Sequence, residues 1–479
     1  MSQFVICSIN GEQTVLDYHR RGGIWPFQKL LDVYNNLVSI KSKPFSQKLS
    51  GFVIFPVLLA LFIPGVTATA RPLPGAPAAK QLSIAAAGAV GDGATINTAA
   101  IQKAVDTLAT NGGGTLVIPK GEFLSGAIFL KPGVNLQLDK GAVLKGSTNI
   151  EDYPELETRI EGHFQVWVPA LVNASNVDHL RITGQGTIAG GGKPFWDAFG
   201  QAFRTNRLTT NLDVKRPRNI FIRDSKDVQI SGISLRESSF WNLHLFRCAD
   251  VLVKNVDIRG PIRAPSTDGI DVDSCRNVTI KNSYISVVDD NICLKGNKGT
   301  SALDDTNIPP VEHIRISGCE FGLGACALTV GSEATIVRDV VMENCSLTGT
   351  NRNNVLKLKI RPDTEEHYEN ITVRNIQVQN TNAQLVSIAG WGQYVDFEGK
   401  PAPSQWITNV TLQNISGTLH DFGKVDGTKK STVENLTFKN INITLKNPAV
   451  VTRNVKNLKF TNVKINGVAY TGEQPTSEK

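Results

Sequence analysis

Short stretches in which hydrophobic and polar residues alternate recur along most of the chain after residue 177. The recurring unit has six positions, as in KDVQISGISL and RNVTIKNSYI. The first is Asn or Asp, the second is a branched apolar residue, the fourth is Ile, Val or Phe, and the sixth is Asn or Gly. The third and fifth positions vary. Alternation with period two predicts half-buried strands. Recurrence every twenty-odd residues predicts a solenoid whose coils share one core. Nine clear copies begin at Asp227, Asp250, Asn277, His313, Asp339, Asn370, Asn409, Asn435 and Asn457.

The remaining pattern fits one long domain. We predict an all-β fold, a single-stranded right-handed parallel β-helix over residues 82–467, with a short helix capping its N-terminal end. For that helix, Asn97 or Thr98 can cap the start and Gly112–Gly114 end it. Its apolar residues recur at helical spacing, at Ile101, Ala104, Val105 and Leu108. An antiparallel sandwich is the alternative, but hairpin signals are few. Residues 468–479 are expected to form a C-terminal tail.

The first 70 residues have the pattern of a targeting segment. Gly51–Val66 is an uncharged apolar run of 16 residues, with lysines before it and Ala68-Thr69-Ala70 after it. This order is typical of a secretory signal peptide, and the run is short for a membrane span. The alternative is a signal anchor that is not cleaved. The stretch of about 40 residues before the lysines indicates either that the basic region of the signal peptide is long or that the start site has been placed too far upstream. We assign 1–70 to an extension with a signal segment and 71–81 to a linker.

Composition and net charge exclude some classes of protein and of binding partner. The chain is 41% hydrophobic and 19% charged, which excludes a disordered protein. Of the net charge of +7, only +4 remains without residues 1–70, too little to indicate nucleic-acid binding but suitable for an anionic substrate. We expect a monomer that is secreted or periplasmic, without stable membrane insertion after signal cleavage.

Cysteine spacing follows the coils. A stacked, buried set of free cysteines is predicted, because cysteine packs well as a small hydrophobe. Export would also permit a disulfide from Cys319 or Cys326. The expected stack comprises Cys248, Cys275, Cys293, Cys319 and Cys345.

Two acidic segments interrupt the repeat, APSTDGIDVD at 264–273 and SVVDDNIC at 286–293. Asp268 precedes Asp289 and Asp290 by about one coil, so adjacent strands about 4.8 Å apart would bring the three together. Crowded carboxylates raise at least one pKa. A proton-donating acid beside a carboxylate that activates water is the chemistry of glycoside hydrolysis. The alternative is that both segments are ordinary turns.

A basic pair follows in the chain. Lys357 and Lys359 alternate on a predicted strand, so both face the same side. If the register brings them near the carboxylates, two cations there would bind a carboxylated sugar. The alternative is an edge strand protected by lysines.

With these residues in place, the sequence resembles glycoside hydrolase family 28, the polygalacturonase and rhamnogalacturonan hydrolase family with a pectin-lyase-like β-helix. The resemblance covers nearly all of 82–467, including GQGTIAGGGKPFW and SSFWNLHLFRC. The family's Asn-Thr-Asp corresponds to Ser266–Asp268 and its Asp-Asp to Asp289-Asp290. Its Gly-His-Gly falls at Gly322–Gly324 and its Arg-Ile-Lys at Lys357–Lys359.

The resemblance implies an inverting hydrolase that cleaves α-glycosidic bonds of galacturonic-acid-containing pectic polysaccharide or oligogalacturonide, with no metal or other cofactor and no nucleic-acid partner. It implies Asp289 as general acid and Asp268 with Asp290 as the pair that activates water. It implies Lys357 and Lys359 as ligands of the substrate carboxylate. His244 and Tyr394 lie in cleft segments and are further candidates for substrate binding, although a buried wall histidine is the alternative for His244.

Three departures from the family pattern indicate altered subsites. Leu323 replaces a histidine and cannot hydrogen-bond, Lys357 lacks the bidentate fork of arginine, and Ser266 replaces an asparagine. The alternatives are therefore a rhamnogalacturonan-type hydrolase of the same family, a polysaccharide lyase, and a non-catalytic carbohydrate-binding β-helix.

Overall fold

The computed structural model describes residues 4–9, 12–17, 80–351 and 353–472. The chain divides into two compact units, Met1–Leu73 and Pro74–Lys479. In the first, β1 (Phe4–Ile9) pairs antiparallel with β2 (Glu12–Asp17). The predicted signal segment at 51–66 lies outside the described residues. Among the residues that are described, none of the helices has the length and apolar character needed to cross a membrane.

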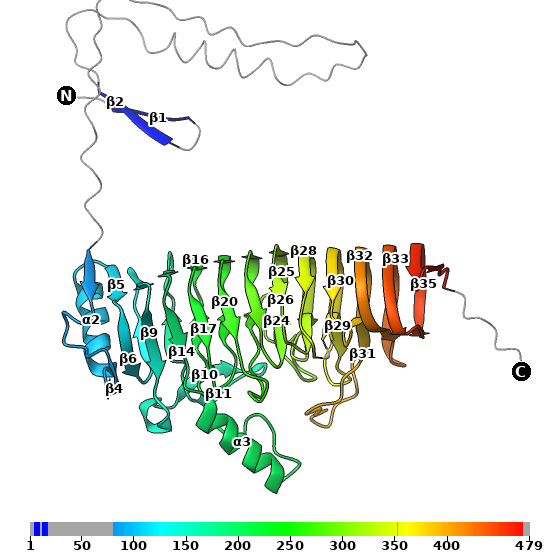
Figure 1. Ribbon diagram of the computed structural model, residues 1–479, viewed down its shortest axis with the longest axis horizontal. Helices are drawn as coiled ribbons and strands as arrows, with labels where there is room; N and C mark the ends of the chain where they lie inside the picture. Colours follow the sequence, from blue (N-terminus) through cyan, green and yellow to red (C-terminus); the bar gives the residue numbers. More distant parts are fainter. Residues whose placement is uncertain (1–3, 10–11, 18–79, 352, 473–479) are drawn as a thin grey trace, which may run out of the picture. The chain divides into compact units, whose positions relative to one another are not determined.

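The second unit is a parallel β-helix, as predicted, in which strands stack coil upon coil (Figure 1). One stack carries the candidate site and is called here the site stack. Its strands are β7 (Ile128–Leu130), β12 (Val172–Ser175), β15 (Ile220–Arg223), β18 (Leu243–Phe246), β21 (Ile270–Asp273), β24 (Asp290–Lys295), β27 (Cys326–Val330), β29 (Asn354–Ile360), β31 (Gln384–Gly390), the end of β32 (Gln405–Asp426) and β34 (Val451–Arg453).

Two further stacks complete each coil. The middle stack comprises β3 (Gln81–Ser83), β5 (Gly114–Ile118), β8 (Val134–Leu138), β13 (Arg181–Gly184), β16 (Lys226–Ser231), β19 (Ala249–Lys254), β22 (Arg276–Lys281), β25 (Val311–Ser317), β28 (Ile336–Leu347), β30 (Glu366–Gln379), β32, β33 (Ser431–Asn447) and β35 (Val455–Ile465). The third comprises β4 (Asp92–Ile96), β6 (Gly121–Ser125), β9 (Ala142–Gly146), β14 (Thr187–Ala189), β17 (Ser234–Arg236), β20 (Asp257–Arg259), β23 (Tyr284–Ser286) and β26 (Glu320–Phe321). A last strand, β36 (Val468–Ala469), turns back on β35.

The nine predicted repeats are the nine coils of the middle stack from β16 onwards. Val228 pairs with Val251 and Val251 with Val278, the residues that follow the first position of each unit. The first residue of every unit has a positive φ, between 52° and 59°. Asn and Asp tolerate this left-handed conformation better than other side chains. The recurrent Asn and Asp therefore mark the corner at which each coil turns.

The core is a continuous column of inward-facing Ile, Val, Leu and Phe side chains. Near the C-terminal end, the ring of Phe438 lies 5.0 Å from that of Phe422 and 5.2 Å from that of Phe460. A second row of asparagines stacks outside the core. Asn375 donates to Asn344, and Asn414 to Asn375, each at 2.9 Å.

The capping helix is α2 (Thr98–Thr110), which buries the four predicted apolar residues. Asn97 stands at its N-cap position, but its side chain hydrogen-bonds the Val90 and Thr95 backbone instead of the helix. Three elements were not predicted: the hairpin of β10 (Leu156–Ile160) and β11 (His163–Trp167), the helix α3 (Lys193–Thr205), and a short 3-10 helix, Ile150–Asp152. The hairpin and α3 lie on the lower side of the coils in Figure 1.

The six described cysteines are free and buried. They do not form the single stack that was predicted. Cys248 N donates to Cys275 Sγ at 3.2 Å, and Cys319 lies against Cys345 one coil on, so two separate pairs exist. Cys293 belongs to neither, because it lies within β24 and its thiol donates to the Gly331 carbonyl at 2.9 Å.

The shared core leads to a test of stability. Phe438→Ala should lower the free energy of unfolding by about 3–5 kcal/mol, because it removes a fully buried ring that packs on two coils. Thr437→Ala, one residue earlier and outside the core, should change it by less than about 0.5 kcal/mol. Chemical denaturation followed by circular dichroism measures both. Equal effects would contradict a core that is continuous through these coils.

Candidate active site

Three aspartates meet where β21 and β24 begin. Ile270 pairs with Ile292, a step of one coil, and Gly269 N donates to the Asp290 carbonyl at 3.0 Å. The same step brings Asp268 beside Asp290. Asp290 N donates to Asp289 Oδ1 at 3.0 Å. All three aspartates line one pocket of about 200 Å³.

The predicted lysines reach the same pocket from β29. Lys359 Nζ lies 2.9 Å from Asp290 Oδ2, and Lys357 Nζ lies 3.9 Å from Asp290 Oδ1. The Lys359 ammonium also lies over the ring of Trp391, 4.7 Å from its centroid. The register across β27 and β29 therefore places both lysines against a carboxylate that lies 67 or more residues earlier in the chain.

The neighbouring aspartates have opposite tendencies to ionise. Burial opposes ionisation of Asp290, but Lys359 and Lys357 overcome it and lower its pKa to about 2. Burial and the adjacent Asp290 carboxylate raise the pKa of Asp289. One member of the pair is thus held as an anion while the other retains its proton to higher pH.

A second charged network, centred on Lys295, was missed from the sequence. Lys295 Nζ lies 3.2 Å from Glu333 Oε2 and 3.6 Å from both Asp268 Oδ2 and Asp271 Oδ1. Burial raises the pKa of Asp271 to about 7, and burial with Asp271 and Asp289 nearby raises that of Asp268. Charged residues at alternate positions of IDVD and ICLK were the available signal, because they face away from the core on adjacent coils.

Loops also contribute to the lining of the pocket. Asn211 Nδ2 donates to Glu161 Oε1 at 2.9 Å, and Asn211 N donates to the Tyr394 hydroxyl at 3.3 Å. Arg361 donates to the carbonyls of Gln393 and Tyr394 at 2.9 and 3.0 Å. Tyr394 therefore lines the pocket, and a buried arginine fixes its backbone.

His244 lies outside this lining. It has no exposed surface, and its ring packs edge-on against Trp241, which does line the pocket. Its Nδ1 lies 2.6 Å from Arg218 Nη1 and its Nε2 3.3 Å from Asp273 Oδ2. Burial lowers its pKa to about 3, so the ring is neutral. Leu323 is also absent from the pocket lining.

Among the residues that the structure describes, one group of side chains has metal-ligand spacing. Asp268, Asp290 and Cys293 each offer a ligand atom within 4.8 Å of the others. However, ammonium groups of Lys359 and Lys295 already contact the two carboxylates. Burial raises the pKa of the Cys293 thiol well above its usual value, whereas a metal requires the thiolate. The residues present fit a metal ion poorly.

Neighbouring carboxyl groups with opposite pKa shifts, set beside lysines, are a combination that enzymes acting on glycosidic bonds use. The model of glycosyl hydrolases family 28 matches residues 110–465, and the chain belongs to this family. An exopolygalacturonase of Zea mays is 28% identical over 370 residues, covering 76% of this chain and 77% of that protein. An endo-polygalacturonase of Pectobacterium carotovorum subsp. carotovorum is 28% identical over 339 residues, covering 67% and 77%.

The fold has a close counterpart among solved structures. A hyperthermoactive exopolygalacturonase from Thermotoga maritima matches with a TM-score of 0.70 at 22% identity, over 82% of this chain and 93% of that one. With the family match and the curated relatives, the chain is a polygalacturonase-like glycoside hydrolase.

The Lys359–Asp290 contact leads to a pH test. Lys359→Met removes the nearest cation, so the pKa of Asp290 should rise and the carboxylate should regain its proton at a higher pH. The acid limb of the kcat/KM profile should therefore move upward by about 1–3 pH units. Lys359→Arg keeps the charge and should leave the limb close to that of the wild type. The same shift in both variants, or in neither, would contradict this assignment.

Proposed function

We propose that this protein hydrolyses α-glycosidic bonds of galacturonic-acid-containing pectic polysaccharide with inversion of configuration. The observation that carries the proposal is the Asp289–Asp290 pair, in which one carboxyl tends to keep its proton and its neighbour is held ionised by two lysines. An acid and a base in one pocket are the groups that hydrolysis with inversion requires.

Asp289 is the general acid. It gives its proton to the glycosidic oxygen as the bond to the anomeric carbon breaks, and the leaving sugar departs as an alcohol. Asp290 takes a proton from a water molecule that attacks the anomeric carbon from the opposite face, which inverts its configuration. Asp268, one coil away and 3.6 Å from Lys295, orients that water together with Asp290.

Lys357 is the main ligand of the substrate carboxylate. It is less buried than Lys359, and its ammonium is 3.9 Å from Asp290 and makes no hydrogen bond within the described residues. Lys359 is committed to Asp290, so its first role is to keep that carboxylate ionised. Tyr394, which also lines the pocket, offers its hydroxyl to a sugar. His244 supports the wall through Trp241 and does not itself contact substrate.

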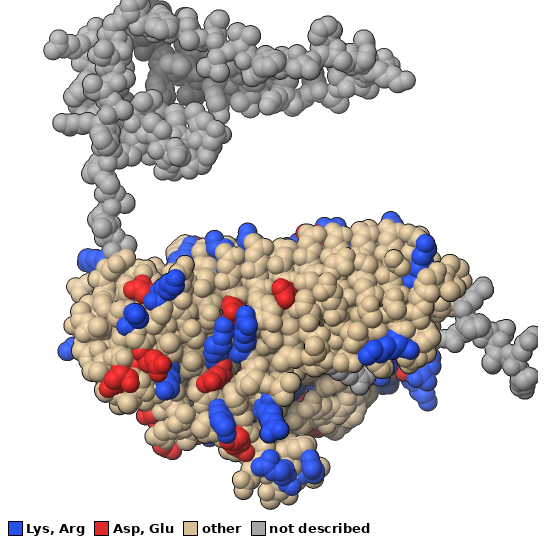
Figure 2. All heavy atoms as spheres, in the orientation of Figure 1, with Lys and Arg blue, Asp and Glu red and all other residues tan. Residues whose placement is uncertain are grey.

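The substrate class and the location rest on different supports. Curated relatives named as polygalacturonases, together with cations beside the catalytic carboxylates, support a pectic uronide. On the face shown in Figure 2, basic and acidic side chains are interspersed. Nucleic-acid binding requires a continuous basic patch, so this face does not support a nucleic-acid partner. The apolar run at 51–66 supports export, and hence a secreted or periplasmic enzyme. Leu323 outside the pocket lining supports subsites that differ from the family pattern.

Removing the general acid tests the mechanism. Asp289→Asn should lower kcat on polygalacturonate by about 10²–10⁴-fold, because the leaving oxygen loses its proton donor. Asp304→Asn changes an exposed aspartate that does not line the pocket, and should leave kcat unchanged. Release of reducing ends measures both. Equal activity of Asp289→Asn and the wild type would overturn the assigned acid.

A product profile distinguishes the alternatives. Homogalacturonan and rhamnogalacturonan are digested side by side, and the anomer first released is followed by proton NMR. We expect cleavage of homogalacturonan with inversion, resistance to chelators, and no product that absorbs in the ultraviolet. Preference for rhamnogalacturonan would assign the other family activity. Ultraviolet-absorbing products would indicate a lyase, and binding without cleavage a non-catalytic protein.

A further inference from the structure

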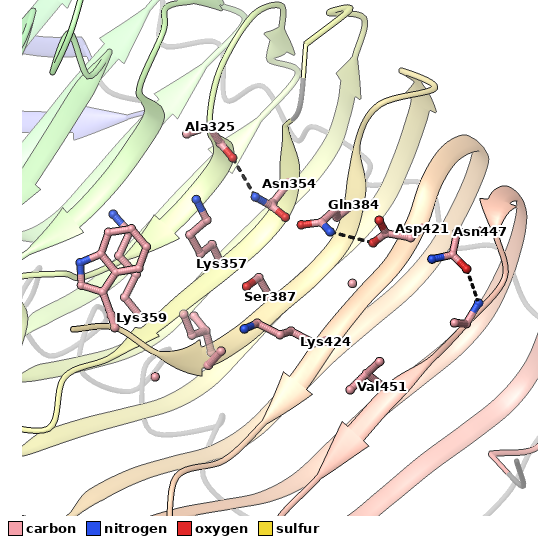
Figure 3. A pocket seen from close by; sticks show the side chains of 16 residues that line it. Ala325, Asn354, Lys357, Lys359, Gln384, Ser387, Asp421, Lys424, Asn447 and Val451 are labelled. Atoms are coloured by element: carbon pink, nitrogen blue, oxygen red, sulfur yellow. Dashed lines mark hydrogen bonds between the residues drawn. The ribbon is translucent and has the colours of Figure 1, made fainter. Parts of the chain in front are cut away.

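A groove continues from the catalytic pocket toward the C-terminal coils. It has a volume of about 640 Å³ and shares Lys357, Lys359 and Trp391 with the pocket. It then runs across β29, β31, β32 and β34 of the site stack (Figure 3). The catalytic pocket and this groove are therefore continuous.

Inter-strand register arranges the lining of the groove in two rows. On one side Lys357 pairs with Ser387, Ser387 with Lys424, and Lys424 with Val451. The other side is a row of amide and carboxylate side chains, Asn354, Gln384, Asp421 and Asn447, likewise in register. Figure 3 shows Lys357 and Lys424 on the same side, with Ser387 between them.

The charged residues of the two rows differ in their hydrogen bonds. Asp421 Oδ1 accepts from Gln384 Nε2 at 2.8 Å, and its Oδ2 lies 2.8 Å from His420 Nδ1. Within the described residues, Lys424 has neither a hydrogen bond nor an ion pair, and it is an exposed residue of the groove lining. A cation without a counterion can pair with an anionic ligand without giving up an existing ion pair. Among the described residues that line this part of the groove, Lys424 is thus a cation whose donors are free for a ligand, whereas the Asp421 carboxylate is already hydrogen-bonded.

We propose that Lys424 binds a second carboxylate of the same uronide chain, about two strand spacings, roughly 10 Å, beyond Lys357. This inference rests on the proposed function, and it assigns a subsite that makes a longer anionic chain a better substrate. The chain lies along the groove with its carboxylates toward Lys357 and Lys424. Its hydroxyl groups face Gln384, Asp421 and Asn447.

The floor of the groove leaves room for a sugar chain. Gly423 and Ala449, which have small side chains or none, line it between the two rows. A Cβ atom at Gly423 would meet the Val386 carbonyl oxygen at 1.8 Å, so the approach of β32 to β31 requires glycine there. Gly423 has φ of +88°, which lets β32 bend between Asp421 and Lys424 so that both face the groove. The backbone therefore supports the placement of the two polar rows.

The test compares chain lengths. For the wild type, Lys424→Met and Lys424→Arg, kcat/KM is measured on digalacturonide and on pentagalacturonide, and the ratio of the two is taken. Lys424→Met should lower this length ratio about tenfold, through KM, because one charge-assisted contact is lost. Lys424→Arg should retain most of it. Lys439→Met is the matched control, since this exposed lysine lies outside the groove lining, and should leave the ratio unchanged.

A binding experiment separates this inference from the proposed function. In the inactive Asp289→Asn background, Lys424→Met should weaken pentagalacturonide binding about tenfold by calorimetry. It should make little difference for the methyl-esterified pentasaccharide, which carries no charge for Lys424 to bind. An unchanged length ratio and unchanged affinity, in a wild type that cleaves pectic chains, would overturn the subsite alone. A wild type that neither cleaves nor binds these oligosaccharides would overturn both proposals.

Discussion

Hydrogen-bonded register between adjacent coils is the constraint on which the rest of the structure depends. Each strand of the site stack is aligned with its neighbour by inward Ile, Val and Leu side chains, such as Ile270 against Ile292. A slip of one residue would exchange the inner and outer faces and force aspartates and lysines into the core. The cost of that exchange is what holds Asp268, Asp290 and Lys357 in one small pocket, although other coils and loops separate them in the chain.

Within that pocket, the order of lysines along the stack decides which carboxyl is ionised. Lys359 and Lys357 lie against Asp290, whereas Lys295 is divided among Asp268, Asp271 and Glu333. With help from Lys298, Lys295 overcomes burial at Glu333 and lowers the pKa of that carboxyl. At Asp268 and Asp271, by contrast, burial prevails and raises the pKa. Carboxyl groups within one site are therefore shifted in opposite directions.

The sequence was informative where the physics is local or periodic. The corner residues, the strand period and the single-coil spacing of Asp268 and Asp290 follow from repetition, and all three could be predicted. Glu161, Asn211 and Tyr394 come together through loops of unequal length, and no periodicity sets where such loops meet. Tyr394 was a candidate only through family resemblance, and Glu161 and Asn211 were missed. The cysteine prediction was wrong at Cys293 because similar spacing does not fix which strand of a coil a residue occupies.

The short return of β36 onto β35 has a consequence for the open end of the solenoid. A parallel stack ends in a strand whose backbone groups are free to pair with another chain, which is a template for self-association. Here Val468 and Ala469 pair antiparallel with Ile465 and Lys464, and Tyr470 packs edge-on against Phe460. The exposed face of β35 carries Lys456, Lys459 and Lys464. Reversal of chain direction at Lys464 and Ile465, and like charge along β35, therefore disfavour the addition of another strand at this end of the solenoid.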